Sequence, residues 1–357
     1  MDLIYRMLMN TRENKSNQQK IANNLNISRT TVSRCFTNHS GVNPETRALV
    51  FSEAEKIGYT YLKPRGSKNV SQKTIGVIIC TDHENIHEDH ERSPGFHLMP
   101  GISEFALIND IIVDINIISP GFTADSPEFQ KLIKKNRKVW NGILLIYPFK
   151  TEIIKALKES FPCVSLVEQF GDQIIDCVDV DHNKGLSTII NKLIEKGHKR
   201  IGFLTRSYAV QACWSYRRFS AFNDQLIRKS IPLSKNDVVN VFPDRLLSPQ
   251  DSIKEAIKQT KGGVTAWFCA ADHVAYDLIT HLESAGIEVP KDVSVVGFDG
   301  IPSPLKAHTL STIQIPHRSI GYNATKRLYE IIKNPYDKTQ LISIKGEYLE
   351  GNTLGTA

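Results

Sequence analysis

The sequence predicts a small all-α helix-turn-helix head followed by a larger α/β body built from parallel sheets. Three observations support this division: short amphipathic helical patterns fill residues 17–60, apolar β-rich runs alternate with helical patterns from Lys73 onward, and positive charge gathers near the N-terminal end. A chain of 357 residues is also long enough for two or three domains.

The net charge is divided unevenly along the chain. The total is +6, and residues 1–68 contain eleven Lys or Arg against five Asp or Glu, which gives +6 for this segment alone. The remaining 33 basic and 33 acidic residues cancel. A basic head on a neutral body is typical of nucleic-acid-binding proteins, because the phosphate backbone supplies affinity that does not depend on sequence.

The composition indicates a soluble protein of a reducing compartment. Hydrophobic residues make up 41% of the chain, and no stretch approaches the roughly 20 apolar residues of a membrane span. Residues 1–16 form an N-terminal extension without the features of a secretory signal, so we expect a cytoplasmic location. The six cysteines form no CxxC pair and are expected to be isolated, reduced thiols in the core.

The first two predicted helices are short and joined by a tight turn. Residues 17–25 carry apolar side chains at i, i+1 and i+4, and Ser28 is placed to cap a second helix that ends at Thr37. Within this second helix Val32 and Phe36 are four residues apart and can face the first helix. The other faces remain polar and basic, and are therefore free to contact DNA.

A third helix is predicted to begin at Pro44 and to end at Ile57, before Gly58. Val50 and Ala54 lie on its core-facing stripe. Three helices within about fifty residues form a minimal helix-turn-helix domain, whose second helix normally enters the major groove.

Eight apolar runs in the body predict strands separated by helix-length segments. This alternation indicates βα units and parallel sheets, arranged as two adjacent lobes. The predicted strands cover 74–80, 111–118, 142–148, 163–168, 199–205, 237–242, 265–270 and 293–298.

The body lacks the usual motifs of nucleotide and catalytic chemistry. No phosphate-binding P-loop, dinucleotide fingerprint, GxSxG elbow or HExxH occurs, so we expect neither a cofactor nor an enzymatic activity. Two alternatives stay open: a cytoplasmic sugar-binding module without a DNA role, and an enzyme on the same scaffold whose catalytic residues the sequence does not reveal.

The head resembles that of the lactose-repressor (LacI/GalR) family of transcription regulators. The resemblance covers residues 20–59, with the TVSR, ETR and closing IGY signatures in register. It implies that Arg29 and Thr30 read base edges and that Arg34 contacts a base or a phosphate. It also implies phosphate or positioning contacts by Ser28, Thr31, Ser33, Asn38 and Asn43.

The body resembles the same family, with landmarks that include NGIL, VDVDHNKG, EKGHKRIGFL and VPKDVSVVGFDGIP. The resemblance implies a periplasmic-binding-protein-like core, residues 74–357, for effector binding and dimerisation. Lobe 1 would comprise about 74–174 and 300–325, and lobe 2 about 176–298 and 327–357, with crossings near 175, 299 and 325. A cleft between the lobes would hold a small polar effector of the sugar or nucleobase class.

Four residues match the family's effector-binding positions. Arg218 lies in the RFSAF segment and Asp272 in the AADHVA segment, and a guanidinium with a carboxylate suits sugar hydroxyls or a nucleobase. Glu168, at the end of its strand, matches an acidic contact, and Phe96 matches an aromatic residue that lines the other lobe. A structural role is the alternative for all four.

Two segments depart from the family's pattern. The basic linker at 61–73 contains Pro64 and Gly66, which oppose the hinge helix that the family uses to kink its operator. The loop at 81–97 contains four histidines among acidic residues, which could ligate a metal. We favour a solvated loop and expect no metal site.

The expected organisation is therefore an N-terminal extension at 1–16, a DNA-binding head at 17–60, the linker and the two-lobed body. We expect a homodimeric regulator, acting as a repressor, in which each head binds half of a pseudo-palindromic operator. A cleft effector would shift the balance between DNA-competent and incompetent states. No membrane partner is expected.

Overall fold

The computed structural model describes residues 18–36, 42–57, 59, 73–81, 94–171, 174–208, 210 and 212–357. The predicted extension and nearly all of the linker lie outside this part, as do three of the four histidines of the polar loop. The chain divides into two compact units. The first comprises Met1–Val164 and Gly321–Lys338, and the second Ser165–Ile320 and Thr339–Ala357.

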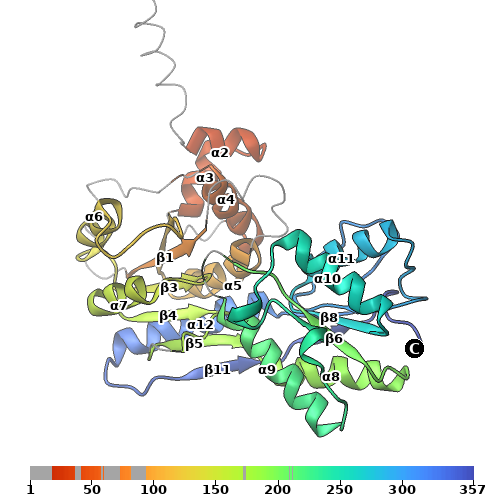
Figure 1. Ribbon diagram of the computed structural model, residues 1–357. Coiled ribbons are helices and arrows are strands. Elements are labelled where there is room, and N and C mark those ends of the chain that lie inside the picture. Colours follow the sequence, from red (N-terminus) through yellow and green to blue (C-terminus); the bar gives the residue numbers. More distant parts are fainter. Residues whose placement is uncertain are drawn as a thin grey trace, which may run out of the picture. The chain divides into compact units, whose positions relative to one another are not determined.

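Three short helices form the head (Figure 1): α2 (Gln18–Asn24), α3 (Arg29–Phe36) and α4 (Pro44–Lys56). These bounds confirm the predicted helices. Ser28 begins α3, since its Oγ accepts a hydrogen bond of 2.9 Å from the Thr31 N–H. Asn43 begins α4 in the same way, because its Oδ1 accepts from the Thr46 N–H at 2.7 Å.

An apolar core joins the three helices of the head. Phe36 lies at its centre, with its ring centroid 5.4 Å from those of Phe51 and Tyr59. Arg47 on α4 is only 1% exposed, and its Nη1 donates to the Cys35 carbonyl at 2.8 Å. This bond satisfies a carbonyl in the last turn of α3, where the helix itself offers no donor.

In the first unit, β1 (Thr74–Cys80) lies between β2 (Ile112–Ile118) and β3 (Gly142–Ile146), and both pairs are parallel. Trp140 packs against Gly76, where a Cβ atom would come within 2.7 Å of the indole ring. Besides the three helices of the head, the first unit contains α5 (Pro94–Ile108), α6 (Pro127–Asn136), α7 (Thr151–Ser160) and most of α12 (His317–Lys333).

The second unit contains a four-stranded parallel sheet in the order β7-β6-β8-β9. Helices α10 and α11 cover one face, and α8 and α9 lie on the other (Figure 1). Phe203 packs on Phe222 of α9, whereas Trp267 donates to Thr260 of α10. The strands are β6 (Ile201–Leu204), β7 (Val238–Val239), β8 (Ala266–Cys269) and β9 (Ser294–Val296). The helices are α8 (His182–Glu195), α9 (Cys213–Arg228), α10 (Pro249–Lys261) and α11 (Asp272–Ser284).

Two further strand pairs belong to the second unit. β5 (Asp176–Val180) pairs in parallel with β11 (Leu341–Ile344), and β10 (Thr312–Gln314) pairs antiparallel with β12 (Glu347–Leu349). β4 (Cys163–Leu166) contains the point at which the chain first passes from one unit to the other. All eight predicted strands form, and the sequence patterns had not predicted the other four, β5, β10, β11 and β12.

The predicted fold class is confirmed, but the limits of the two units differ from those expected. The chain passes between them at 164/165, 320/321 and 338/339, rather than near 175, 299 and 325. Residues 300–320 belong to the second unit because β10 and the residue before it are hydrogen-bonded to the segment that comes directly after β9. The Gly297 N–H donates to the Ser311 carbonyl at 3.0 Å, and the Asp299 N–H to the Ile313 carbonyl at 2.9 Å.

Candidate functional site

The polar face predicted for the second helix of the head is present on α3. Its apolar residues Val32, Cys35 and Phe36 are buried in the head, which fixes the rotation of the helix. The residues of α3 and its cap that are predicted to contact DNA differ in exposure. Ser28, Arg29, Thr30 and Arg34 are exposed, and Thr31 and Ser33 are half-buried.

Two of the predicted DNA contacts also build the head. Ser28 and Asn43 are exposed, yet their side chains cap α3 and α4. A capping residue lies at the positive end of a helix dipole, where phosphates are readily bound. Asn38 lies outside the described residues.

Arg218, the first predicted effector residue, lies on α9 and is only 4% exposed. Its Nη1 donates to the Asp299 carboxylate at 2.9 Å and also to the Ala270 carbonyl. Its guanidinium carbon lies 4.6 Å from the Trp214 ring centroid and 4.2 Å from that of Phe298. This packing holds the guanidinium plane in one orientation.

Asp272 is the first residue of α11 and is fully buried. Its Oδ2 accepts from the Gly300 and Ile301 N–H groups at 2.7 and 2.9 Å, and its Oδ1 accepts from the Thr312 hydroxyl at 2.6 Å. Burial, followed by the nearby charge of Asp299, raises the pKa of Asp272 to about 7. Asp272 therefore fixes the loop after β9, and protein donors already occupy both its oxygens.

Glu168 follows β4 and is 1% exposed. Neither carboxylate oxygen has a partner at hydrogen-bonding geometry among the described residues. Burial raises the pKa of Glu168 to about 8, the Cys213 thiol and backbone oppose this rise, and the charge of Asp179 adds to it. The preceding residue, Val167, has a φ of 56°, a strained value for a β-branched residue.

Arg218, Asp272 and Glu168 belong to one group of buried and half-buried charged residues in the second unit, here called the polar cluster. Its members lie mostly after the carboxyl ends of strands or at helix starts, where α/β proteins bind ligands. They are Glu168, Asp179, His182, Arg217, Arg218, Asp272 and Asp299. Several buried polar atoms of the cluster lack a hydrogen-bond partner among the described residues: both Glu168 oxygens, His182 Nδ1, Arg217 Nε and Arg218 Nε.

The sequence had not indicated four members of the cluster. His182 Nε2 contacts Asp179 Oδ2 at 3.0 Å, and the Arg217 guanidinium donates to the Gln169 carbonyl at 3.1 Å. Burial tends to raise the pKa of Asp179, but hydrogen bonds from His182 and Gln169 outweigh burial and lower this pKa. The acidic residues of VDVD and FDG, placed at strand ends, were the available signal for Asp179 and Asp299.

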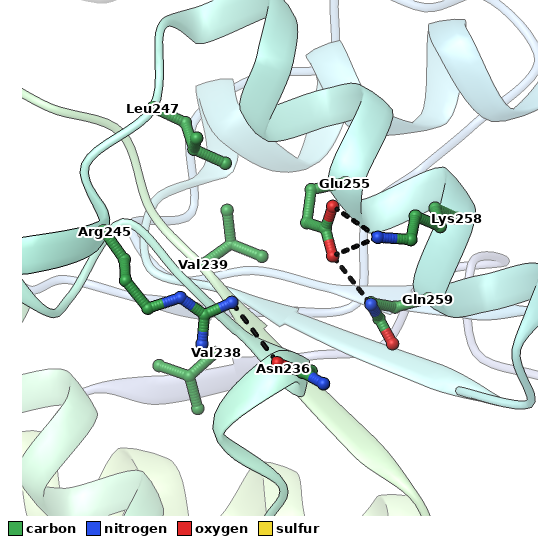
Figure 2. A pocket seen from close by; sticks show the side chains of 8 residues that line it. All are labelled: Asn236, Val238, Val239, Arg245, Leu247, Glu255, Lys258 and Gln259. Atoms are coloured by element: carbon green, nitrogen blue, oxygen red, sulfur yellow. Dashed lines mark hydrogen bonds and ion pairs between the residues drawn. The ribbon is translucent and has the colours of Figure 1, made fainter.

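A cavity of about 300 Å³ lies elsewhere in the second unit, and no residue of the polar cluster lines it. Figure 2 shows that its polar side chains bind one another: Arg245 donates to Asn236, and both Lys258 and Gln259 donate to Glu255. The remaining lining residues are Val238, Val239 and Leu247. Because these polar groups are already paired, the polar cluster is the stronger candidate for recognition of a polar ligand.

Other predicted features are placed as follows. The side chain of Phe96 and the histidines at 83, 87 and 90 lie outside the described residues. Within the described ranges no group of His, Cys, Asp and Glu could hold a metal ion, and no helix is long and apolar enough to cross a membrane. All six cysteines are free, and only Cys213 among them is not buried.

Known proteins are similar to this chain in sequence and in fold. Residues 190–354 match the periplasmic binding protein-like domain family. The HTH-type transcriptional regulator RegA of Clostridium acetobutylicum is 26% identical over 87% of this chain and 91% of its own. Two solved structures, each at 18% identity and covering 95% of this chain, share the fold. They are the complex of the transcriptional regulator CelR with cellobiose, at a TM-score of 0.64 over 100% of that chain, and the Lac repressor dimer bound to operator and the anti-inducer ONPF, at 0.63 over 98%.

These relatives and folds support the resemblance to the lactose-repressor family that the motifs of the head and body indicate. Both solved structures cover 95% of this chain, so the shared fold extends into the head. The relatives are transcription regulators, and the body has a periplasmic-binding-protein-like fold.

Proposed function

We propose that this protein is a repressor of the lactose-repressor family that binds a pseudo-palindromic operator as a homodimer and responds to a small polar effector such as a sugar. The observation that carries the DNA-binding part is the face of α3. Its apolar residues are locked into the head core, while Arg29, Thr30 and Arg34 are exposed. An exposed arginine pair on a helix fixed in this way can reach the guanine edge and a phosphate.

The polar cluster supports the effector part of the proposal. Buried polar groups are normally hydrogen-bonded, and orphaned ones indicate a missing partner. Five such atoms gather in one cluster of the second unit, on Glu168, His182, Arg217 and Arg218. A ligand with several hydroxyl groups would supply the absent donors and acceptors.

The test is operator selection from random DNA with the full-length protein, followed by affinity measurements at fixed salt. Replacing Arg29 and Arg34 with Ala should weaken operator binding by at least about tenfold, since each base contact is worth roughly 1–3 kcal/mol. The control removes the same charge from exposed lysines of the second unit, Lys254 and Lys291. Unchanged affinity in the arginine variant, or equal losses in both variants, contradicts the proposal.

A further inference from the structure

The Glu168 carboxyl group is the least satisfied charged group of the polar cluster. Its side chain is 1% exposed and neither oxygen has a hydrogen-bond partner among the described residues. A buried carboxylate is unfavourable by several kcal/mol, and the Cys213 thiol and backbone offset this only in part, so a proton or an added positive charge stabilises Glu168 further.

The neighbouring groups are committed to other partners. Asp179 accepts from Gln169 at 2.9 Å and contacts His182 at 3.0 Å, and the Arg217 guanidinium donates to the Gln169 carbonyl. One Arg218 nitrogen is taken by Asp299 and Ala270. Among the described residues none of these groups lies at ion-pair distance from Glu168, although Arg217 attracts it from farther away and the thiol and backbone of Cys213 lie beside it.

The charges of the polar cluster are also unbalanced. Four carboxyl groups face two guanidinium groups and one imidazole. Even with His182 charged, the ionised cluster would keep one negative charge in excess. A low-dielectric site with such an excess favours a cation.

We propose that the effector is a polyhydroxylated amine, such as an amino sugar, whose ammonium group binds the Glu168 carboxylate. This inference rests on the proposed effector role of the second unit. The ammonium supplies the donors that both Glu168 oxygens lack, and hydroxyl oxygens accept from the unpaired Nε atoms of Arg217 and Arg218. Because burial raises the pKa of Glu168 to about 8, the carboxyl group without a ligand holds a proton at neutral pH, and the ammonium replaces that proton.

The experiment compares sugars that differ by a single amine. Isothermal titration of the full-length protein at pH 7 uses glucose with glucosamine, galactose with galactosamine, and N-acetylglucosamine as a neutral amide. At least one amine should bind at least about tenfold more tightly than its hydroxyl parent and its amide, as expected for a desolvated charge pair. Equal binding within every pair, or no binding by either amine, overturns the proposal.

Variants at position 168 assign the preference to this side chain. Glu168→Gln should reduce the amine preference to near unity, Glu168→Asp should keep it with weaker affinity, and Glu195→Gln, an exposed glutamate of the same unit, should leave it unchanged. A preference that survives Glu168→Gln overturns the assignment, and the Asp variant provides the test if the Gln variant does not fold. Operator binding without any ligand is measured separately, so a neutral sugar as effector would refute the amine while leaving the repressor function intact.

Discussion

The Thr312 hydroxyl donates a 2.6 Å hydrogen bond to Asp272 Oδ1, which joins β10 to the first turn of α11. Both side chains are buried, and Asp272 also holds two backbone N–H groups of the loop after β9. The last donor to an otherwise saturated carboxylate therefore comes from a strand that the sequence patterns did not predict.

Replacing Thr312 with Val should lower the free energy of unfolding of the second unit by about 1–3 kcal/mol, since a buried acceptor loses its donor. Urea unfolding measures the change. Thr312→Ser keeps the hydroxyl and serves as the control, with most of the stability retained. Equal stability of Thr312→Val and the wild type would show that Asp272 does not depend on this bond.

The buried Asp114 on β2 should make stability fall as the pH rises. Burial raises its pKa from 3.8 to about 6, although the Trp140 indole N–H donates to it at 2.8 Å. The folded state binds this proton more tightly than the unfolded state, so the stabilisation is complete below pH 4 and is lost as pH increases through 6. The loss amounts to about 3 kcal/mol at about 1.4 kcal/mol per pKa unit.

Unfolding of wild type and Asp114→Asn between pH 4 and 8 tests this effect. The variant cannot titrate at this position, so its stability should decline less with pH. Asp125→Asn, at an exposed position of the same unit, should keep the wild-type slope. Parallel pH profiles for wild type and Asp114→Asn would contradict the prediction.

Arg47 should be required for the head and dispensable for the body. Arg47→Met keeps much of the buried volume but leaves the Cys35 carbonyl without its donor, which costs the head about 1–3 kcal/mol. We expect weaker operator binding, faster proteolysis of the head and unchanged melting of the body. Arg137→Met, at an exposed position, is the matched control. Normal operator affinity in Arg47→Met would disprove this role.

Cys213 should react with iodoacetamide before the five buried cysteines, yet more slowly than an ordinary thiol. Burial, followed by the charge of Glu168, raises its pKa to about 11, so little thiolate is present at neutral pH. Above pH 8, where Glu168 is ionised, Glu168→Gln removes the opposing charge and should speed the reaction, and bound effector should slow it. Mass spectrometry identifies the modified residue, with Cys213→Ser as the control. First modification of any other cysteine would be inconsistent with this exposure.

The predictable parts of this protein are those written into local patterns. The three head helices follow from capping residues and apolar spacing, and Ser28 caps α3 as its position predicted. The buried parallel strands follow from continuous apolar runs, as in β1. The sequence patterns did not predict the short strands β10 and β11. Each strand has only three or four residues, half of those in β11 are exposed, and so neither forms a continuous apolar run.

The sequence by itself determined that a basic three-helix head precedes an α/β body, because periodicity and charge are properties of neighbouring residues. Only the tertiary structure decided the polar cluster, since Glu168, Asp179, Arg217 and Asp299 come from segments far apart in the chain. The tertiary structure also decided the role of Asp272: protein donors occupy both of its carboxylate oxygens, whereas no described residue donates to Glu168 at full hydrogen-bonding geometry. Which buried carboxylate is satisfied by protein donors depends on where each donor lies in space, and no local pattern contains that information.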